Sequence, residues 1–407
     1  MMARLLLAAL FALVAWPAEA QTLAIVHARA WTMTADAPVE NATILIDGGK
    51  IVSVDSGGGV PAGVRTIDAA GKLVTPGLVN AASQIGLVEI SSAPDTRDTI
   101  AKGSLGISFD VSRALNGNSA LVALARSDGM TRGISFPTPS PVAPFSGLAA
   151  MIRLREGVDI LDRAAVAEFA VIGGNADNGS RAGQWQKLRD MLDDARRKVA
   201  DGKPVDGDTA PLKRVLAGDI PLAIMTNRES DVRQAIALAR DFGVHVVIVG
   251  GAEAWRAAGD LAAANIPVVL DPQANLPESF DQLGLRQDNA AILARAGVRV
   301  VFGLVGGKLE YNYNAGLALR QSAGIAVAAG LPYRTALEAI TVNPLAVFDG
   351  GGGGKLQAGS DADLVIWDGD PLEPSTNAVT VVIEGRETSL ENRQTRLVER
   401  YAPRLAQ

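Results

Sequence analysis

The sequence contains no cysteine and very little histidine. Among its 407 residues the two histidines are His27 and His245. The absence of cysteine excludes disulfides, thiol catalysis, zinc–cysteine sites and a lipid anchor on an N-terminal cysteine. The scarcity of histidine excludes any site that requires a cluster of imidazole rings.

An excess of positive charge is also missing. The chain has 38 Lys and Arg against 44 Asp and Glu, which gives a net charge of −6, and no basic block stands out. We therefore expect no nucleic-acid binding. A hydrophobic content of 48% with 20% charged residues excludes a disordered or fibrous chain. The length predicts one large domain or two ordinary ones.

No apolar run is long enough to span a membrane, but the N-terminus has the pattern of an export signal. Arg4 is followed by the apolar stretch Leu5–Trp16 and then by the small-x-small sequence Ala18–Ala20. We expect residues 1–20 to be a signal peptide that is cleaved before Gln21. The mature protein is then expected in the periplasm or outside the cell, without a membrane span. A cysteine-free chain fits an oxidising compartment.

Both ends of the mature chain have the pattern of short strands separated by turns. The expected strands are residues 23–26, 42–46, 50–54 and 66–68 near the N-terminus, and 362–367 and 379–384 near the C-terminus. Turn signals such as Asp47-Gly48-Gly49 separate them. The chain therefore begins and ends in β structure.

The middle of the chain alternates strands with helices. The expected strands are residues 221–225, 244–249, 266–270 and 298–302, and the expected helices are 230–243, 252–264 and 289–296. Ser230 is predicted to cap the first of these helices and Gly243 to end it. Such alternation predicts a parallel sheet, either doubly wound or closed into a barrel. The length of residues 74–350 favours a barrel of eight βα units.

Four segments carry a family signature. They are residues 46–54 (IDGGKIVSV), 67–80 (IDAAGKLVTPGLVN), 336–344 (ALEAITVNP) and 355–367 (KLQAGSDADLVIW). These segments resemble the amidohydrolase superfamily, most closely its imidazolonepropionase-like and related branch. The resemblance implies an α/β fold: a (β/α)8 TIM-like barrel over residues 74–350 and a small β-sandwich from residues 21–73 and 351–390. Residues 391–407 would form a C-terminal tail.

The resemblance also implies a chemistry, which is the hydrolysis of C–N bonds in cyclic amides and related substrates. One or two zinc ions at the C-terminal mouth of the barrel would activate water. The residues at the corresponding ligand positions are Ala82 and Gln84 after strand 1, Met225 at strand 5, Gly250 at strand 6 and Val305 at strand 8. None of these is a histidine or an acid. The sequence therefore predicts that the metal site is lost and that no cofactor is bound.

The two histidines do not replace the missing ligands. His27 falls on the edge of the first strand, outside the barrel. His245 falls at the start of a strand, on the order of 16 Å below its C-terminal end at about 3.3 Å per residue. We expect both to be structural or surface residues.

Polar residues are nevertheless expected at the mouth of the barrel. They are Asn80, Gln84, Ser146, Asn227, Arg228, Glu253, Asp271, Lys308 and Glu310. Such a set can form a pocket for a small polar ligand. Glu253 and Asp271 are also candidates for a metal-free acid/base pair. The alternative, which we prefer, makes Glu253 an acid favoured by a helix dipole and Asp271 an ordinary turn residue.

Two functions therefore remain open. In the first, the protein is non-catalytic and binds a small polar ligand, or supports an active relative, or forms a homo-oligomer. In the second, it hydrolyses C–N bonds by a divergent or metal-free acid/base mechanism. A third, less favoured hypothesis is an exported structural protein whose pocket has no function.

Overall fold

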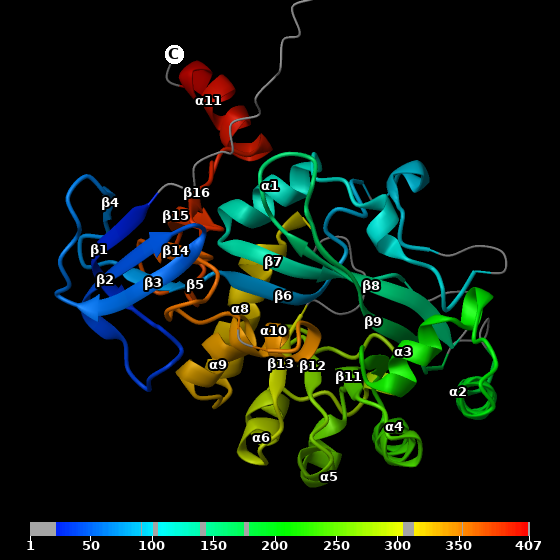
Figure 1. Ribbon diagram of the computed structural model, residues 1–407. Coiled ribbons are helices and arrows are strands. Elements are labelled where there is room, and N and C mark those ends of the chain that lie inside the picture. Colours follow the sequence, from blue (N-terminus) through cyan, green and yellow to red (C-terminus); the bar gives the residue numbers. More distant parts are fainter. Residues whose placement is uncertain are drawn as a thin grey trace, which may run out of the picture.

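The structure is a computed structural model that describes residues 22–90, 92–100, 105–138, 144–174, 179–303, 313–351 and 353–405. Two eight-stranded sheets organise these residues, one made from both ends of the chain and one forming a barrel (Figure 1). The expected signal peptide lies outside the described residues, as do Val305, Lys308 and Glu310. The expected α/β fold, with an eight-stranded barrel and a separate terminal β domain, is confirmed.

The terminal sheet joins the two ends of the chain. Its strands are β1 (Leu23–Ala30), β2 (Val39–Asp47), β3 (Lys50–Ser56), β4 (Arg65–Asp68), β5 (Leu73–Pro76), β14 (Leu364–Trp367), β15 (Ala378–Ile383) and β16 (Arg386–Glu387). They follow the order β16-β15-β14-β5-β1-β2-β3, with β4 paired to β1. The join is made where β5 pairs antiparallel with β14, so that Pro76 faces Leu364.

The terminal sheet is one hydrogen-bonded sheet, whereas the sequence predicted a sandwich. Backbone bonds from Ile51 to Ser360 (2.9 Å) and from Ala362 to Gly49 (2.9 Å) attach the β2–β3 turn to the segment before β14. The sheet thus curls over its own core, in which Ile25 and Ile44 pack with Leu364. A single curled sheet buries its apolar face as two stacked sheets would.

The barrel has one reversed strand. Its strands, in the order in which they pair, are β6 (Leu78–Ser83), β7 (Met130–Ser135), β8 (Phe145–Arg153), β9 (Leu161–Val171), β10 (Leu222–Thr226), β11 (Val246–Gly250), β12 (Val268–Leu270) and β13 (Val300–Phe302). Strand β8 runs antiparallel to β7 and β9, and the other neighbours are parallel. Residues 154–160 between β8 and β9 are too few for a crossover helix, so these strands form a hairpin.

The barrel is nearly closed by contact between its first and last strands. A Cβ placed on Gly303, directly after β13, would stand 2.5 Å from the backbone nitrogen of Ala82 in β6. Side chains alternate along the strands: Val247 and Val301 point into the barrel, while Ile248 and Val300 pack outward against the helices.

Helices surround the barrel (Figure 1). They are α1 (Ala120–Ser127), α2 (Arg181–Ala200), α3 (Pro211–Ala217), α4 (Glu229–Phe242), α5 (Ala258–Ala263), α6 (Asn289–Arg295), α8 (Ala315–Ala328), α9 (Tyr333–Ala339) and α10 (Val342–Phe348). A further helix, α11 (Arg393–Leu405), follows the terminal sheet. Helix α4 ends as predicted at Gly243, whose φ is +69°.

The predicted start of α4 at Ser230 is wrong by two residues. Arg228 is the N-cap and makes no side-chain capping bond. The carboxylate of Glu253 accepts the N–H of Glu229 instead, at 2.9 Å. A distant acid therefore satisfies one of the backbone donors that have no partner within the first turn of the helix.

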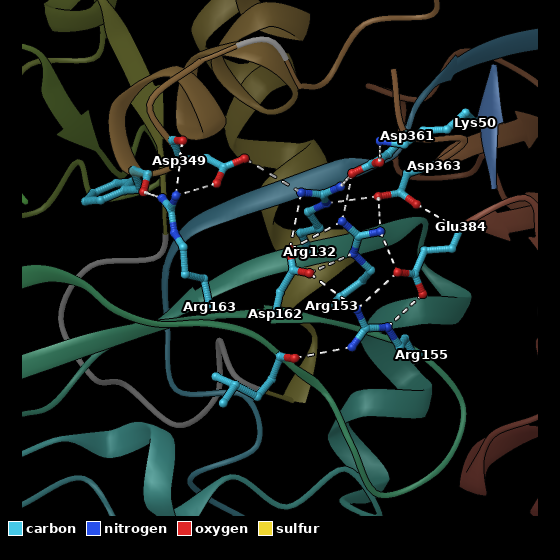
Figure 2. A network of polar contacts seen from close by, with 12 residues as sticks. Lys50, Arg132, Arg153, Arg155, Asp162, Arg163, Asp349, Asp361, Asp363 and Glu384 are labelled. Carbon is cyan, nitrogen blue, oxygen red and sulfur yellow. Dashed lines mark hydrogen bonds and ion pairs between the residues drawn. The ribbon is translucent and has the colours of Figure 1, made fainter. Parts of the chain in front are cut away.

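A network of ion pairs ties the barrel to the terminal sheet (Figure 2). Arg132 of β7 and Arg153 of β8 both bind Asp361, and Arg132 Nε also donates to Asp363 Oδ2 at 2.9 Å. Asp162, at the start of β9, lies 3.3 Å from Arg132. Because β7 and β9 are parallel to β10, the network lies at the N-terminal end of the barrel, opposite its mouth.

Candidate ligand site at the barrel mouth

A cavity of about 120 Å³ lies where β10, β11 and β12 end. Its lining residues are Met225, Asn227, Gly250, Leu270, Asp271, Pro272, Ala274, Gln282, Leu285, Arg286, Gln287, Asn289 and Ala290. This is the C-terminal face of the barrel, where barrel proteins place their binding residues. The volume is below the range of about 300–1,000 Å³ for pockets of drug-sized ligands, so the cavity favours a small occupant.

Asp271 is the ionisable group in this cavity whose protonation is most affected by the fold. It directly follows β12, and its Oδ1 accepts the N–H of Gln273 at 3.0 Å and the hydroxyl of Ser322 at 3.3 Å. Burial raises the pKa of Asp271 to about 6, against the opposing effect of these hydrogen bonds. The side chain therefore changes protonation near neutral pH, which is the property that acid/base chemistry requires.

Asn227 and Gly250 pack closely together at the ends of β10 and β11. The carbonyl of Asn227 accepts the N–H of Glu253 at 2.9 Å, and its Oδ1 accepts the N–H of Ala252 at 3.3 Å. Gly250 has a φ of +95°, and a Cβ at this position would stand 2.8 Å from Asn227 Oδ1. The positive φ and the close approach of Asn227 therefore both favour glycine at position 250.

The segment between β12 and α6 supplies half of the cavity. Sequence reasoning missed its contributors Gln282, Arg286 and Gln287, together with Asn289 of α6. The available signal was the length of residues 271–288, since long connections after barrel strands often carry function. Asp281 fixes this segment in place by accepting the N–H of Gly174 at 2.8 Å and by pairing with Arg181.

Asn289 offers an acceptor to a ligand. Its Nδ2 donates to the carbonyl of Gly251 at 3.0 Å. Its Oδ1 is buried and has no hydrogen-bond partner within the part of the chain that the structure describes. A buried acceptor without a partner costs about 1–3 kcal/mol, and a ligand donor in the cavity would remove that cost.

Several predicted pocket residues do not line the cavity. Glu253 caps α4, and Arg228 lies at the same helix start. Asn80 accepts the N–H of Ala82 at 3.1 Å and so holds the irregular end of β6, and Gln84 is buried just after it. Ser146 is buried in β8, where its hydroxyl has no partner among the described residues.

The residues at the expected metal positions do not fit a zinc ion. Ala82 is fully buried, Met225 is apolar and Gly250 cannot carry a side chain without strain, so only Gln84 brings an oxygen. A catalytic zinc ion takes three ligands of the His, Asp, Glu or Cys type. Across the described ranges, no group of three or more His, Asp or Glu side chains is placed to hold a metal.

The two histidines lie apart and at the surface. His27 contacts Asp68 at 3.0 Å on the terminal sheet, where both side chains are exposed. His245 is exposed just before β11. Neither residue lines the cavity.

The barrel, together with a β domain built from both termini, is an architecture that this chain shares with solved amidohydrolase structures. The chain is 23% identical to an amidohydrolase from Thermotoga maritima MSB8, with a TM-score of 0.81 over 90% of this chain and 99% of the other. A prolidase solved with N-methylphosphonate-L-proline is 17% identical, with a TM-score of 0.58 over 91% and 100% of the two chains. The resemblance that the sequence indicated is confirmed at the level of the fold.

Sequence comparison adds a short match. An amidohydrolase, tasK, of Hapsidospora irregularis is 46% identical over 57 residues, which are 14% of this chain and only 6% of that protein. No family model matches the chain. Within the described residues, no helix combines the length and apolar character needed to cross a membrane.

Proposed function

We propose that this chain is an exported amidohydrolase-like protein that binds no metal, binds a small polar ligand at its barrel mouth and does not catalyse hydrolysis. The observation that carries the proposal is the composition of the mouth. The cavity keeps an ionisable acid and several amides, whereas the ligand positions hold Ala82, Gln84, Met225 and Gly250. Export rests on the sequence pattern of residues 1–20.

The groups in the cavity favour a ligand that both donates and accepts hydrogen bonds. Asn289 Oδ1 and Asp271 accept, and the amides of Gln282 and Gln287 can do either. Arg286 also lines the cavity, with its guanidinium paired to Asp288 and its guanidinium carbon 4.7 Å from the centroid of the Trp255 ring. Small amides fit this pattern, including cyclic amides and proline dipeptides, the latter related to the phosphonate found in the prolidase.

The first test measures metal and ligand binding by the mature chain beginning at Gln21. After incubation with excess zinc and removal of free metal, elemental analysis is expected to find no stoichiometric metal. Thermal-shift and calorimetric measurements with a panel of cyclic amides and dipeptides are expected to identify a ligand. Its affinity should fall about 10- to 100-fold in Asp271→Asn, the range for a lost hydrogen bond to a charged group. Tight occupancy by one or two zinc ions per chain would contradict the proposal.

Glu253→Gln is the matched control. It also removes one carboxylate charge at the same end of the barrel, but Glu253 caps α4 and does not line the cavity. Its ligand affinity should stay within about twofold of the parent protein, while its stability falls by about 1 kcal/mol through the weakened cap. Equal losses of affinity in both variants would argue against the cavity as the binding site.

One observation favours a second candidate function, a metal-free hydrolase of C–N bonds. A carboxylate with a pKa of about 6 is suited to act as a general base at neutral pH. This function predicts turnover of the same panel that survives a chelator, disappears in Asp271→Asn and persists in Glu253→Gln. We further propose that the chain supports an active relative, which copurification tests, or associates with itself, which light scattering tests.

A further inference from the structure

Helix α11 projects from the body of the protein, which it contacts at the end of α1. Figure 1 shows it at the top of the molecule, clear of the barrel and of the terminal sheet. Every residue from Arg393 to Pro403 is exposed. Helices of this length are marginal in water without a partner, because most helical stability in proteins comes from packing an apolar face. The exposed helix is therefore expected to gain a packing surface from another molecule.

The helix has an apolar stripe and a basic stripe side by side. The apolar residues Leu397, Val398 and Tyr401 recur at the three- and four-residue spacing of one helix face. Leu397 is 41% exposed, Val398 64% and Tyr401 44%. At about 100° per residue, Arg393, Arg396 and Arg400 fall on the adjoining face. Long arginine side chains beside an apolar stripe are typical of helices that lie in a membrane interface.

The base of the helix is held firmly. Asn392 is buried, and its Oδ1 accepts the N–H groups of Gln394 at 2.8 Å and Thr395 at 3.1 Å, which caps the helix. Its Nδ2 donates to Ser127 at the end of α1, at 3.0 Å. The cap fixes where the helix leaves the protein, so both stripes are presented away from the body at a defined site.

We propose that α11 is a docking element for an anionic lipid surface, with its apolar stripe buried among the acyl chains and its arginines at the headgroups. Charge complementarity favours this partner. The whole chain carries a net charge of −6, whereas α11 has four arginines, Arg393, Arg396, Arg400 and Arg404, against one acid, Glu399. Arg396 pairs with Glu391 at 3.3 Å, but both side chains are mostly exposed, so an anionic headgroup can compete for this arginine. A second copy of the chain is disfavoured, because pairing two apolar stripes would bring the flanking arginines of both copies together.

The experiment is sedimentation of the full mature chain with lipid vesicles. Vesicles of phosphatidylglycerol and phosphatidylcholine should bind the protein at low salt and release it at high salt, and vesicles of phosphatidylcholine alone should bind it weakly. Each arginine near an anionic surface contributes about fivefold to binding, so the double variant Arg396→Gln/Arg400→Gln should bind ~30-fold more weakly. Leu397→Ser should also weaken binding, by removing apolar contact.

The control is Arg113→Gln/Arg240→Gln, which changes the net charge equally at two arginines that are 85% and 77% exposed on other elements. It should bind within about twofold of the parent. Absence of binding to the anionic vesicles, or equal losses in both double variants, would overturn the proposal. So would a dimer that forms without lipid and is lost in Leu397→Ser, because a second copy would then cover the stripe. Thermal unfolding checks that every variant is folded.

Discussion

The carboxyl group of Asp271 makes the free energy of unfolding depend on pH. Its pKa is raised to about 6 by burial, above the value near 3.9 expected in the unfolded chain. Between these two values the folded protein binds more protons than the unfolded chain. The contribution of this residue is therefore fully present below about pH 4 and is lost as the pH rises to about 6.

Asp271→Asn should remove this pH dependence. The shift corresponds to about 1–3 kcal/mol, so the variant should be more stable than the parent by that amount at pH 8, with a difference that shrinks towards pH 4. The asparagine oxygen can still accept the N–H of Gln273. Urea unfolding of both proteins across this range measures the difference, and a difference independent of pH would show that Asp271 titrates normally.

The position of single residues at the mouth could be predicted only where a strand led to them. Met225, Asn227 and Asp271 line the cavity because each lies at the end of a strand that the apolar pattern located. The role of Glu253 depends on a bond to Glu229 of another element, which no local pattern reveals. Gln282, Arg286 and Asn289 were missed because the segment before α6 has no periodic pattern.

The sequence predicted the positions of the strands and helices better than the direction in which each strand runs in the sheet. The alternation of strands and helices after residue 221 gave β10 to β13 and α4 in their places. It did not indicate the reversed strand β8, because an apolar strand has the same composition whichever way it runs. The short connection of residues 154–160, with Gly157 at a φ of +95°, was the available signal for a hairpin.

The end of β11 offers a test of whether the mouth tolerates a side chain at position 250, where the family resemblance implies a histidine. Gly250→Ala should destabilise the protein by about 1–3 kcal/mol, because φ is positive and the added Cβ would meet Asn227 at 2.8 Å. Gly250→His should cost at least as much. Both effects are measured as a lower free energy of unfolding in urea.

Gly259→Ala is the matched control for this change. Gly259 lies in α5, and a Cβ there would meet no atom within 4 Å. Alanine is the better helix former, so this variant should gain about 0.5–1 kcal/mol. If Gly250→Ala and Gly259→Ala changed stability alike, the loop would not be fitted to glycine at position 250.

At the scale of the whole molecule, the ion-pair network couples the two sheets. Burial alone would raise the pKa of Asp361, but Lys50, Arg132 and Arg153 hold it below its ordinary range. The guanidinium of Arg155 likewise lowers the pKa of Glu384. A lowered carboxyl pKa contributes stability above the unfolded value near pH 4, and this contribution is lost as the pH falls further. Acid should therefore weaken the attachment of the terminal sheet.

Arg132 is the member of this network whose loss should cost most. Its side chain is 5% exposed and contacts Asp162, Asp361 and Asp363. Arg132→Ala would leave Arg153 as the remaining arginine on these three carboxylates. Removing one partner of a buried ion pair costs about 3–5 kcal/mol. Calorimetry at pH 7 should show a much lower midpoint of thermal unfolding for Arg132→Ala. The control Lys50→Gln, which removes an exposed partner of Asp361, should cost under about 1 kcal/mol. Because acid would protonate the same carboxylates, the deficit of Arg132→Ala should narrow below pH 4. A deficit that stayed constant into acid would mean that Arg132 acts through packing and not through charge.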